Sequence, residues 1–130
     1  MSTVTLRDET ATGRELDSVL LPDLPSSITL RELIRLRVRE EVARFNAAEE
    51  DTFRGLVQPT DTEATLNGFR VRCRRRLDWE RQADTAERAF ARNGFFVLVD
   101  DRQVEDIDAV IDLTGDPVVS FVKLVPLVGG

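Results

Sequence analysis

An apolar stretch near the end of the sequence constrains the fold more than any other feature. Its side chains alternate between two rows, Val118, Ser120, Val122 and Leu124 on one side and Val119, Phe121, Lys123 and Val125 on the other. Both rows are largely apolar, so a strand formed here needs cover on both faces. We therefore expect this strand in the middle of a sheet and not at its edge.

The bulk composition predicts a single domain over residues 1–130. A chain of 130 residues that is 42% hydrophobic can bury a core without disulfides or metal ions. Its one cysteine, Cys73, excludes an internal disulfide, and the absence of histidine removes Ser-His-Asp and Cys-His catalysis and His-ligated metal sites. We therefore expect no enzymatic activity, no cofactor and no metal site in the chain itself.

The start of the sequence lacks the basic and apolar regions of a signal peptide, and no apolar run reaches the ~18–20 residues of a membrane span. We therefore expect a cytoplasmic protein with no membrane partner. The net charge of −6 argues against nucleic-acid binding over the whole surface. One basic cluster, residues 70–76 with five arginines, offers a local phosphate contact, but Asp78 and Glu80 balance it and an exposed strand face is the simpler interpretation.

The first half of the chain predicts a hairpin and a helix. Val4 and Leu6 alternate with polar neighbours, and the segment around Leu16 to Leu21 returns as a second strand that the prolines of residues 22–27 should end. Apolar residues then recur every three or four positions, which predicts an amphipathic helix from about Leu30 to Phe45 with Thr29 and Glu32 as a capping box. Its charged side is expected to be a solvated surface, with partner binding as the alternative.

The second half predicts a mixture of helix and strand. Residues 47–68 are polar and predict a long irregular excursion. Further elements follow in the order strand 69–73, helix from Asp78-Trp79 to Asn93-Gly94, buried strand 95–99, short return 103–104 and a brief helical turn or crossover at 107–113. Together with the hairpin and the final strand, these elements predict an α+β fold.

The order of elements, completed by Val-Pro-Leu-Val-Gly-Gly at residues 125–130, resembles the β-grasp proteins, among them ubiquitin and the prokaryotic ubiquitin-like sulfur carriers. The local likeness lies in VLVDDRQV (97–104), GDPVVSF (115–121) and PLVGG (126–130). Molybdopterin-synthase small subunits show a similar pattern. The resemblance implies a β-grasp (ubiquitin-like) fold with an inserted strand–helix segment at about 47–94, which minimal members lack. With this insertion the chain looks more like the larger bacterial ubiquitin-like proteins that are encoded beside activating and conjugating enzymes.

The resemblance also implies a function centred on the final glycines. Gly130 would be the reactive residue, with Gly129 beside it and Pro126, Leu127 and Val128 as the tail that enters a partner. That partner, an activating enzyme, would adenylate the Gly130 carboxylate with ATP, and the chain would then be conjugated to target proteins. A conjugating enzyme and an isopeptidase would be further partners, and a chain that already ends in Gly-Gly would need no trimming. The alternatives are a sulfur carrier with a C-terminal thiocarboxylate and a non-conjugated interaction domain whose glycines are incidental.

Lys123 is the only lysine of the chain and stands on an otherwise apolar strand face. Because an unpaired buried ammonium is costly, the lysine suggests that this face is partly open, and Val119, Phe121, Lys123 and Val125 could then form a docking patch. The interpretation that we slightly favour is that the inserted helix, which carries Trp79 and Phe90, covers the face. The scarcity of lysine fits a modifier that avoids modifying itself, and a coding bias toward arginine explains it equally well.

Overall fold

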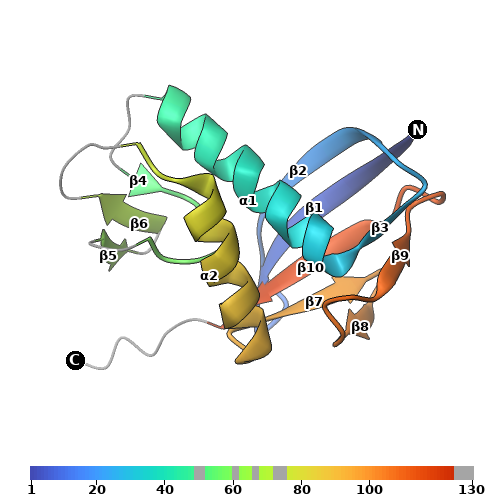
Figure 1. Cartoon of the computed structure of the whole chain (residues 1–130). Helices are drawn as coiled ribbons and strands as arrows, with labels where there is room; N and C mark the ends of the chain where they lie inside the picture. Colours follow the sequence, from blue (N-terminus) through green and yellow to red (C-terminus); the bar gives the residue numbers. More distant parts are fainter. Residues whose placement is uncertain (49–51, 60–61, 66–67, 72–75, 125–130) are drawn as a thin grey trace. The chain divides into compact units, whose positions relative to one another are not determined.

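The structure, a computed structural model, describes residues 1–48, 52–59, 62–65, 68–71 and 76–124. The chain is mixed α and β, as expected, and divides into two compact units (Figure 1). The first unit contains residues 1–31 and 90–130, and the second contains residues 32–89. This division falls at 32 and 89, whereas the sequence suggested an insertion at about 47–94. The organisation as one domain with an insertion stays a prediction.

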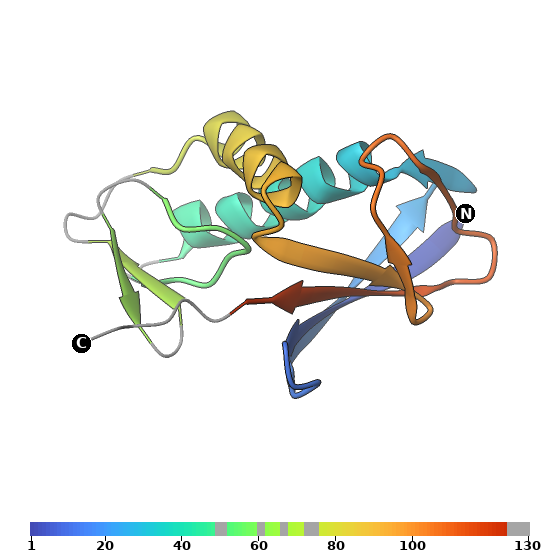
Figure 2. The same ribbon diagram turned by 90° about the horizontal axis from the view of Figure 1, so that it is seen from below.

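The first unit contains a mixed sheet of five strands in the order β2-β1-β10-β7-β8. These strands are β1 (Ser2–Thr10), β2 (Glu15–Leu24), β7 (Phe95–Val99), β8 (Arg102–Val104) and β10 (Val118–Lys123). The central pair, β1 and β10, is parallel, with Thr5 opposite Val118 and Thr10 opposite Lys123. The other three pairings in this sheet are antiparallel. The expected central position of the last strand is thus confirmed; Figure 1 shows β10 between β7 and β1, and Figure 2 shows the same strands from below.

Strand β2 continues past the first of the prolines that were predicted to end it. It runs through Pro22 to Leu24, and Asp23 has a φ of 63°. A proline removes a hydrogen-bond donor, but β2 is the outermost strand, where the outward side of the backbone needs no partner. The pairing with β1 shifts register between Ser2 and Val4, so the extra residue is accommodated as an irregularity of the hairpin. The strand thus ends within residues 22–27 as predicted, but at Leu24, between the two prolines, and Pro22 itself does not end it.

A two-stranded pair also differs from expectation. β9 (Val110–Asp112) pairs antiparallel with β3 (Ser27–Thr29), where the apolar spacing of residues 107–113 had suggested a helical turn or crossover. Immediately after β3, the amides of Leu30 and Arg31 donate hydrogen bonds to the carbonyls of Ala109 and Ile107, at 2.9 and 2.7 Å. Backbone carbonyls of a distant loop therefore satisfy two of the donors that a helix leaves open at its start.

The two predicted helices are present. α1 (Leu30–Ala47) carries its buried side chains at the expected positions, which are Leu30, Leu33, Ile34, Val38, Val42 and Phe45. α2 (Trp79–Ala91) begins after Asp78, whose carboxylate accepts the Glu80 amide at 3.0 Å, and its Ala83 and Ala86 are fully buried. Asn93 follows with a φ of 59°, the left-handed conformation that commonly ends a helix.

The second unit contains a small antiparallel sheet that the sequence did not reveal. Its order is β4-β6-β5, formed by β4 (Thr52–Phe53), β5 (Thr62–Thr65) and β6 (Gly68–Val71). The strand expected at 69–73 is confirmed as far as Val71, and residues 72–75 lie outside the described part. Phe53 is 1% exposed and its ring meets that of Phe45 edge-on, with centroids 5.7 Å apart. The segment expected to be irregular thus supplies β4 and β5 and a core residue of its unit.

Candidate functional site

The predicted reactive tail follows the central strand of the first sheet. β10 ends at Lys123, which lies opposite Thr10 of β1 and Phe95 of β7, and Leu124 is 42% exposed. The residues predicted to be activated or recognised, Val125, Pro126, Leu127, Val128, Gly129 and Gly130, lie outside the described residues. What the structure describes is the base from which this tail continues, a strand hydrogen-bonded on both sides.

Two members of the predicted docking patch are core residues. Val119 and Phe121 are both 0% exposed. The Phe121 ring lies 6.1 Å from that of Phe95 between centroids, and Phe95 in turn lies 5.8 Å from Phe90. A partner therefore has no access to the side chains of Val119 and Phe121 in this structure, and the patch as predicted is not an exposed surface. Val125, its fourth member, lies outside the described residues.

Lys123 reaches a carboxylate on the neighbouring strand. Its Nζ lies 3.4 Å from Oδ2 of Asp8, and the two side chains are 26% and 14% exposed. Asp8 stands opposite Asp17 of β2 in the antiparallel register. Like charges opposite each other on neighbouring strands repel, so an ammonium group beside Asp8 stabilises this corner of the sheet. The lysine is thus accommodated by an ion pair within the first unit, which sequence reasoning missed because Asp8 and Lys123 are far apart in the chain.

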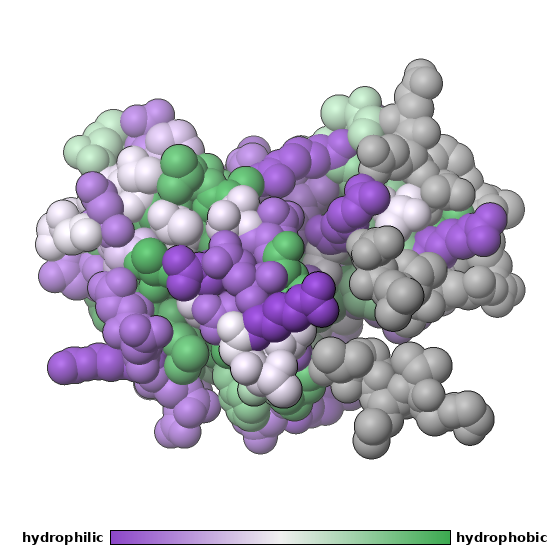
Figure 3. Space-filling model, turned by 180° about the vertical axis from the view of Figure 1, so that it is seen from behind, coloured by the Kyte–Doolittle hydropathy of each residue, from purple (hydrophilic) through white to green (hydrophobic). Residues whose placement is uncertain are grey.

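The opposite face of the same sheet is the accessible one. We call it the open face and define it by Leu20, Phe96, Leu98, Val118 and Val122, which the strand registers place on one side. Leu20 is 65% exposed and the other four are half-buried. On the same side, the Ser120 hydroxyl donates to Glu9 at 3.5 Å, and Arg7 lies 3.7 Å from Glu9. Figure 3, seen from the side opposite to Figure 1, shows hydrophobic residues interspersed with hydrophilic ones.

The sequence contained a signal for the open face, although it was not decisive. Thr3, Thr5, Arg7 and Glu9 form the polar row of β1, and a polar row indicates the solvent side of a sheet. The register places Val118 beside Thr5 and Val122 beside Glu9, so the open side of β10 carries its valines at 118 and 122. Without knowledge that β1 and β10 are neighbours, the rows of the two strands cannot be matched.

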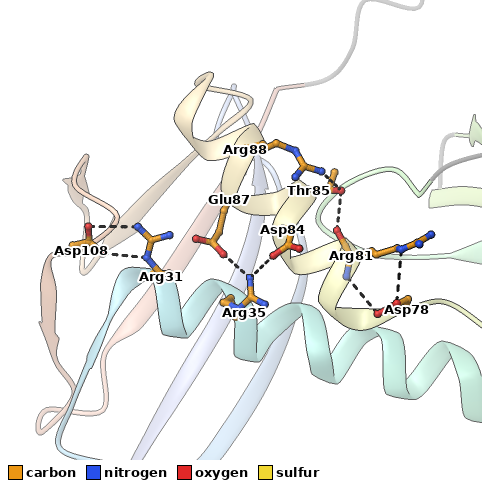
Figure 4. A network of polar contacts seen from close by, with 9 residues as sticks. All are labelled: Arg31, Arg35, Asp78, Arg81, Asp84, Thr85, Glu87, Arg88 and Asp108. Atoms are coloured by element: carbon orange, nitrogen blue, oxygen red, sulfur yellow. Dashed lines mark hydrogen bonds and ion pairs between the residues drawn. The ribbon is translucent and has the colours of Figure 1, made fainter.

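The charged face of α1 is engaged within the second unit. Arg35 donates to Oδ1 of Asp84 at 2.9 Å and also to Glu87, both on α2 (Figure 4). The hydrogen bond to Asp84 is the main cause that raises the pKa of Arg35 above its ordinary value, and the guanidinium stays charged. The guanidinium carbons of Arg35 and Arg39 lie 5.7 and 5.6 Å from the Trp79 ring centroid. These contacts explain Arg35 and Arg39 as links to α2 and not only as part of a solvated surface.

Among the residues that the structure describes, the other charged groups form no site with chemistry of its own. Arg70 and Arg76 of the basic cluster are exposed, while Cys73 and the arginines at 72, 74 and 75 lie outside the described residues. Asp100 and Asp101 form the predicted turn after β7, with φ values of 47° and 68°. Among the described residues, no group of three or more carboxylates or thiols is arranged to hold a metal ion. No helix in the part of the chain described here is long and apolar enough to cross a membrane.

Comparison with known proteins adds no relative. No family model, no curated protein and no solved structure matches the chain. A function therefore has to be argued from the sequence and the geometry above.

Proposed function

We propose that the chain is a protein of the β-grasp class. The observation that carries the proposal is the order and direction of the strands in the first unit. The β1–β2 hairpin flanks one side of the last strand, β7 and β8 flank the other, and β10 runs parallel to β1 at the centre. A last strand in the middle of the sheet, beside the N-terminal hairpin, supports the proposal.

Within this class, the proposed function is that of a ubiquitin-like protein modifier activated at Gly130. A partner adenylating enzyme would use ATP, and the Gly130 carboxylate oxygen would attack the α-phosphorus while pyrophosphate leaves. A cysteine thiolate would then displace AMP to form a thioester, from which the acyl group passes to a target amine. Gly129 and Gly130 suit this role because the absence of side chains permits close approach of another backbone. The chemistry belongs to the partner enzymes, and this chain supplies the carboxylate.

Two features of the described residues support this proposal. The first is a fixed origin for the tail, provided by β10 between β1 and β7. The second is a surface for the enzymes that handle it, for which the open face is the candidate. This assignment moves the proposed contact from Val119 and Phe121 to Val118 and Val122 on the other side of the same strand.

The proposal is tested by mass spectrometry of the chain, tagged at its N-terminus and expressed in its native host. Trypsin cleaves after Lys123, so a conjugated target lysine would carry Leu124–Gly130 as a seven-residue branch. We expect such branched peptides from proteins captured with the tag. They should be lost when Gly130 is replaced by phenylalanine, because the bulky side chain blocks entry into a narrow channel.

Gly115→Ala is the matched control, since a Cβ at this position meets no heavy atom within 4 Å. It should leave the branched peptides unchanged. An intact chain that has exchanged one oxygen for sulfur, without branched peptides, would refute the modifier and establish the sulfur carrier. Recovery of the unmodified chain alone would contradict both and leave a non-conjugated interaction domain.

A further inference from the structure

The side chain of Lys123 is partly buried, and its amine is paired with a carboxylate. It is the only lysine of the chain, and its side chain is 26% exposed. Its strand position puts it on the same side of β10 as Val119 and Phe121, both fully buried. Its Nζ is paired with Asp8 at 3.4 Å, and the Asp8 side chain is itself only 14% exposed. The sole lysine is therefore set into the rim of the core and not on the open face.

We propose that Asp8 keeps Lys123 from serving as an acyl acceptor, so that copies of this chain are not linked to one another through lysine. The part of this inference that concerns linked copies rests on the proposed modifier function. The part that concerns the accessibility of Lys123 does not. If both hold, copies of the modifier are not joined to one another through isopeptide bonds to lysine.

The withheld reaction is an aminolysis. The Lys123 amine of one copy would attack the Gly130 carbonyl carbon of another copy held as a thioester. A C–N bond would form, the C–S bond would break, the enzyme thiolate would leave, and the proton of the amine would pass to water. Attack needs Nζ to come free of its carboxylate partner and to approach the carbonyl carbon closely. Lys123 meets neither requirement while it pairs with Asp8 at the edge of the buried face.

The accessibility of Lys123 is measured with a small acylating probe, the N-hydroxysuccinimide ester of acetic acid. Arg102→Lys places a second lysine at an exposed position of β8 in the same unit, so both amines compete in one molecule. We expect the acetylation of Lys123 to be about fivefold slower than that of the lysine introduced by Arg102→Lys. This factor corresponds to a free energy of ~1 kcal/mol, the upper end of the range for a partly exposed ion pair. Asp8→Asn in that protein should raise the acetylation rate of Lys123 by up to this factor, because it removes the ion pair and leaves the partial burial of the side chain unchanged.

Two results would overturn the inference. If Lys123 reacts as fast as the lysine introduced by Arg102→Lys, then Lys123 is not withheld. This comparison is made in a single protein that keeps Asp8. A slow Lys123 whose rate is unchanged by Asp8→Asn is not withheld by Asp8.

Conjugation in the native host gives the second readout. Branched peptides that join Gly130 of one copy to Lys123 of another should be absent from the wild-type chain and present with Asp8→Asn. Their presence with the wild type contradicts the inference. If neither protein gives branched peptides on any target, the modifier function fails, while the acetylation rates still decide whether Asp8 withholds Lys123.

Discussion

Replacing Arg37 with methionine should destabilise the second unit far more than the loss of a surface ion pair. Arg37 and Glu41 stand one helical turn apart on α1 and their side chains are 6% and 10% exposed. The Arg37 Nε donates to Glu41 Oε1, and the other carboxylate oxygen, Oε2, accepts the Leu56 amide at 3.1 Å. With methionine at position 37, the buried carboxylate would lose its guanidinium partner.

The expected magnitude follows from the burial of this pair. Exposed pairs at this spacing contribute ~0.3–0.5 kcal/mol, whereas removing one partner of a buried pair costs ~3–5 kcal/mol. We expect Arg37→Met at the lower end, about 3 kcal/mol, because the Leu56 amide still solvates the carboxylate. Adding Glu41→Gln should recover most of the loss, since an amide oxygen still accepts the Leu56 hydrogen and no charge remains buried.

Urea unfolding followed by the fluorescence of Trp79 measures these changes, because Trp79 is the only tryptophan and lies in the same unit. Arg81→Met is the matched control. Arg81 also pairs with an acidic residue one turn away, Asp78 at 3.9 Å, but their side chains are 88% and 58% exposed. Its loss should cost less than ~0.5 kcal/mol. An Arg37→Met variant no less stable than Arg81→Met, or one that Glu41→Gln does not rescue, would refute the reasoning.

Two further predictions concern single positions. Thr114→Val should raise the pKa of Asp112 toward its ordinary value, because the Thr114 hydroxyl and amide donate to Asp112 Oδ1 at 2.7 and 2.9 Å and lower that pKa. Because the pKa is lowered in the folded protein, the stabilisation from this carboxylate is present above its ordinary pKa and is lost as the pH falls through the lowered pKa. The same Asp112 pKa in both proteins, measured by ¹³C NMR titration of the carboxyl group, would contradict the prediction. Gly55→Ala should lower the free energy of unfolding by ~1–3 kcal/mol, because the added Cβ would overlap the buried Phe53 ring. Gly115→Ala should change it by no more than ~0.5 kcal/mol, and unfolding followed by circular dichroism measures both.

The local elements of this protein were largely predictable from short patterns. The apolar spacing from Leu30 to Phe45 indicated α1, and Asp78 and Asn93 marked the two ends of α2. The continuous run Phe95–Val99 matched β7 over its full length. Such patterns work because a period of two or of about 3.6 residues follows from the backbone geometry of each element. They extend even to the central position of β10, whose two apolar rows required cover on both faces.

The pairings between distant segments were not predictable in the same way. Ile28 pairs with Ile111, and each lies in a segment of only three strand residues, too short for a period to be recognised. The glycine at position 68 gave no sign in the sequence that it closes a small sheet, although a Cβ there would come within 2.6 Å of the Phe53 carbonyl oxygen. Pro22 indicated a strand end and was tolerated because β2 turned out to be an edge strand.

The sequence by itself determined the two helices and the longer strands, because those choices depend on neighbours within a few residues. It also placed Gly129 and Gly130 a few residues beyond a central strand, and on this the proposed modifier function depends. Only the tertiary structure decided which side of β10 is accessible and what accompanies Lys123. Both depend on β1 lying beside β10 in one register, which brings Asp8 within reach of Lys123. Such contacts join residues more than a hundred positions apart, so they leave no periodic pattern in either segment.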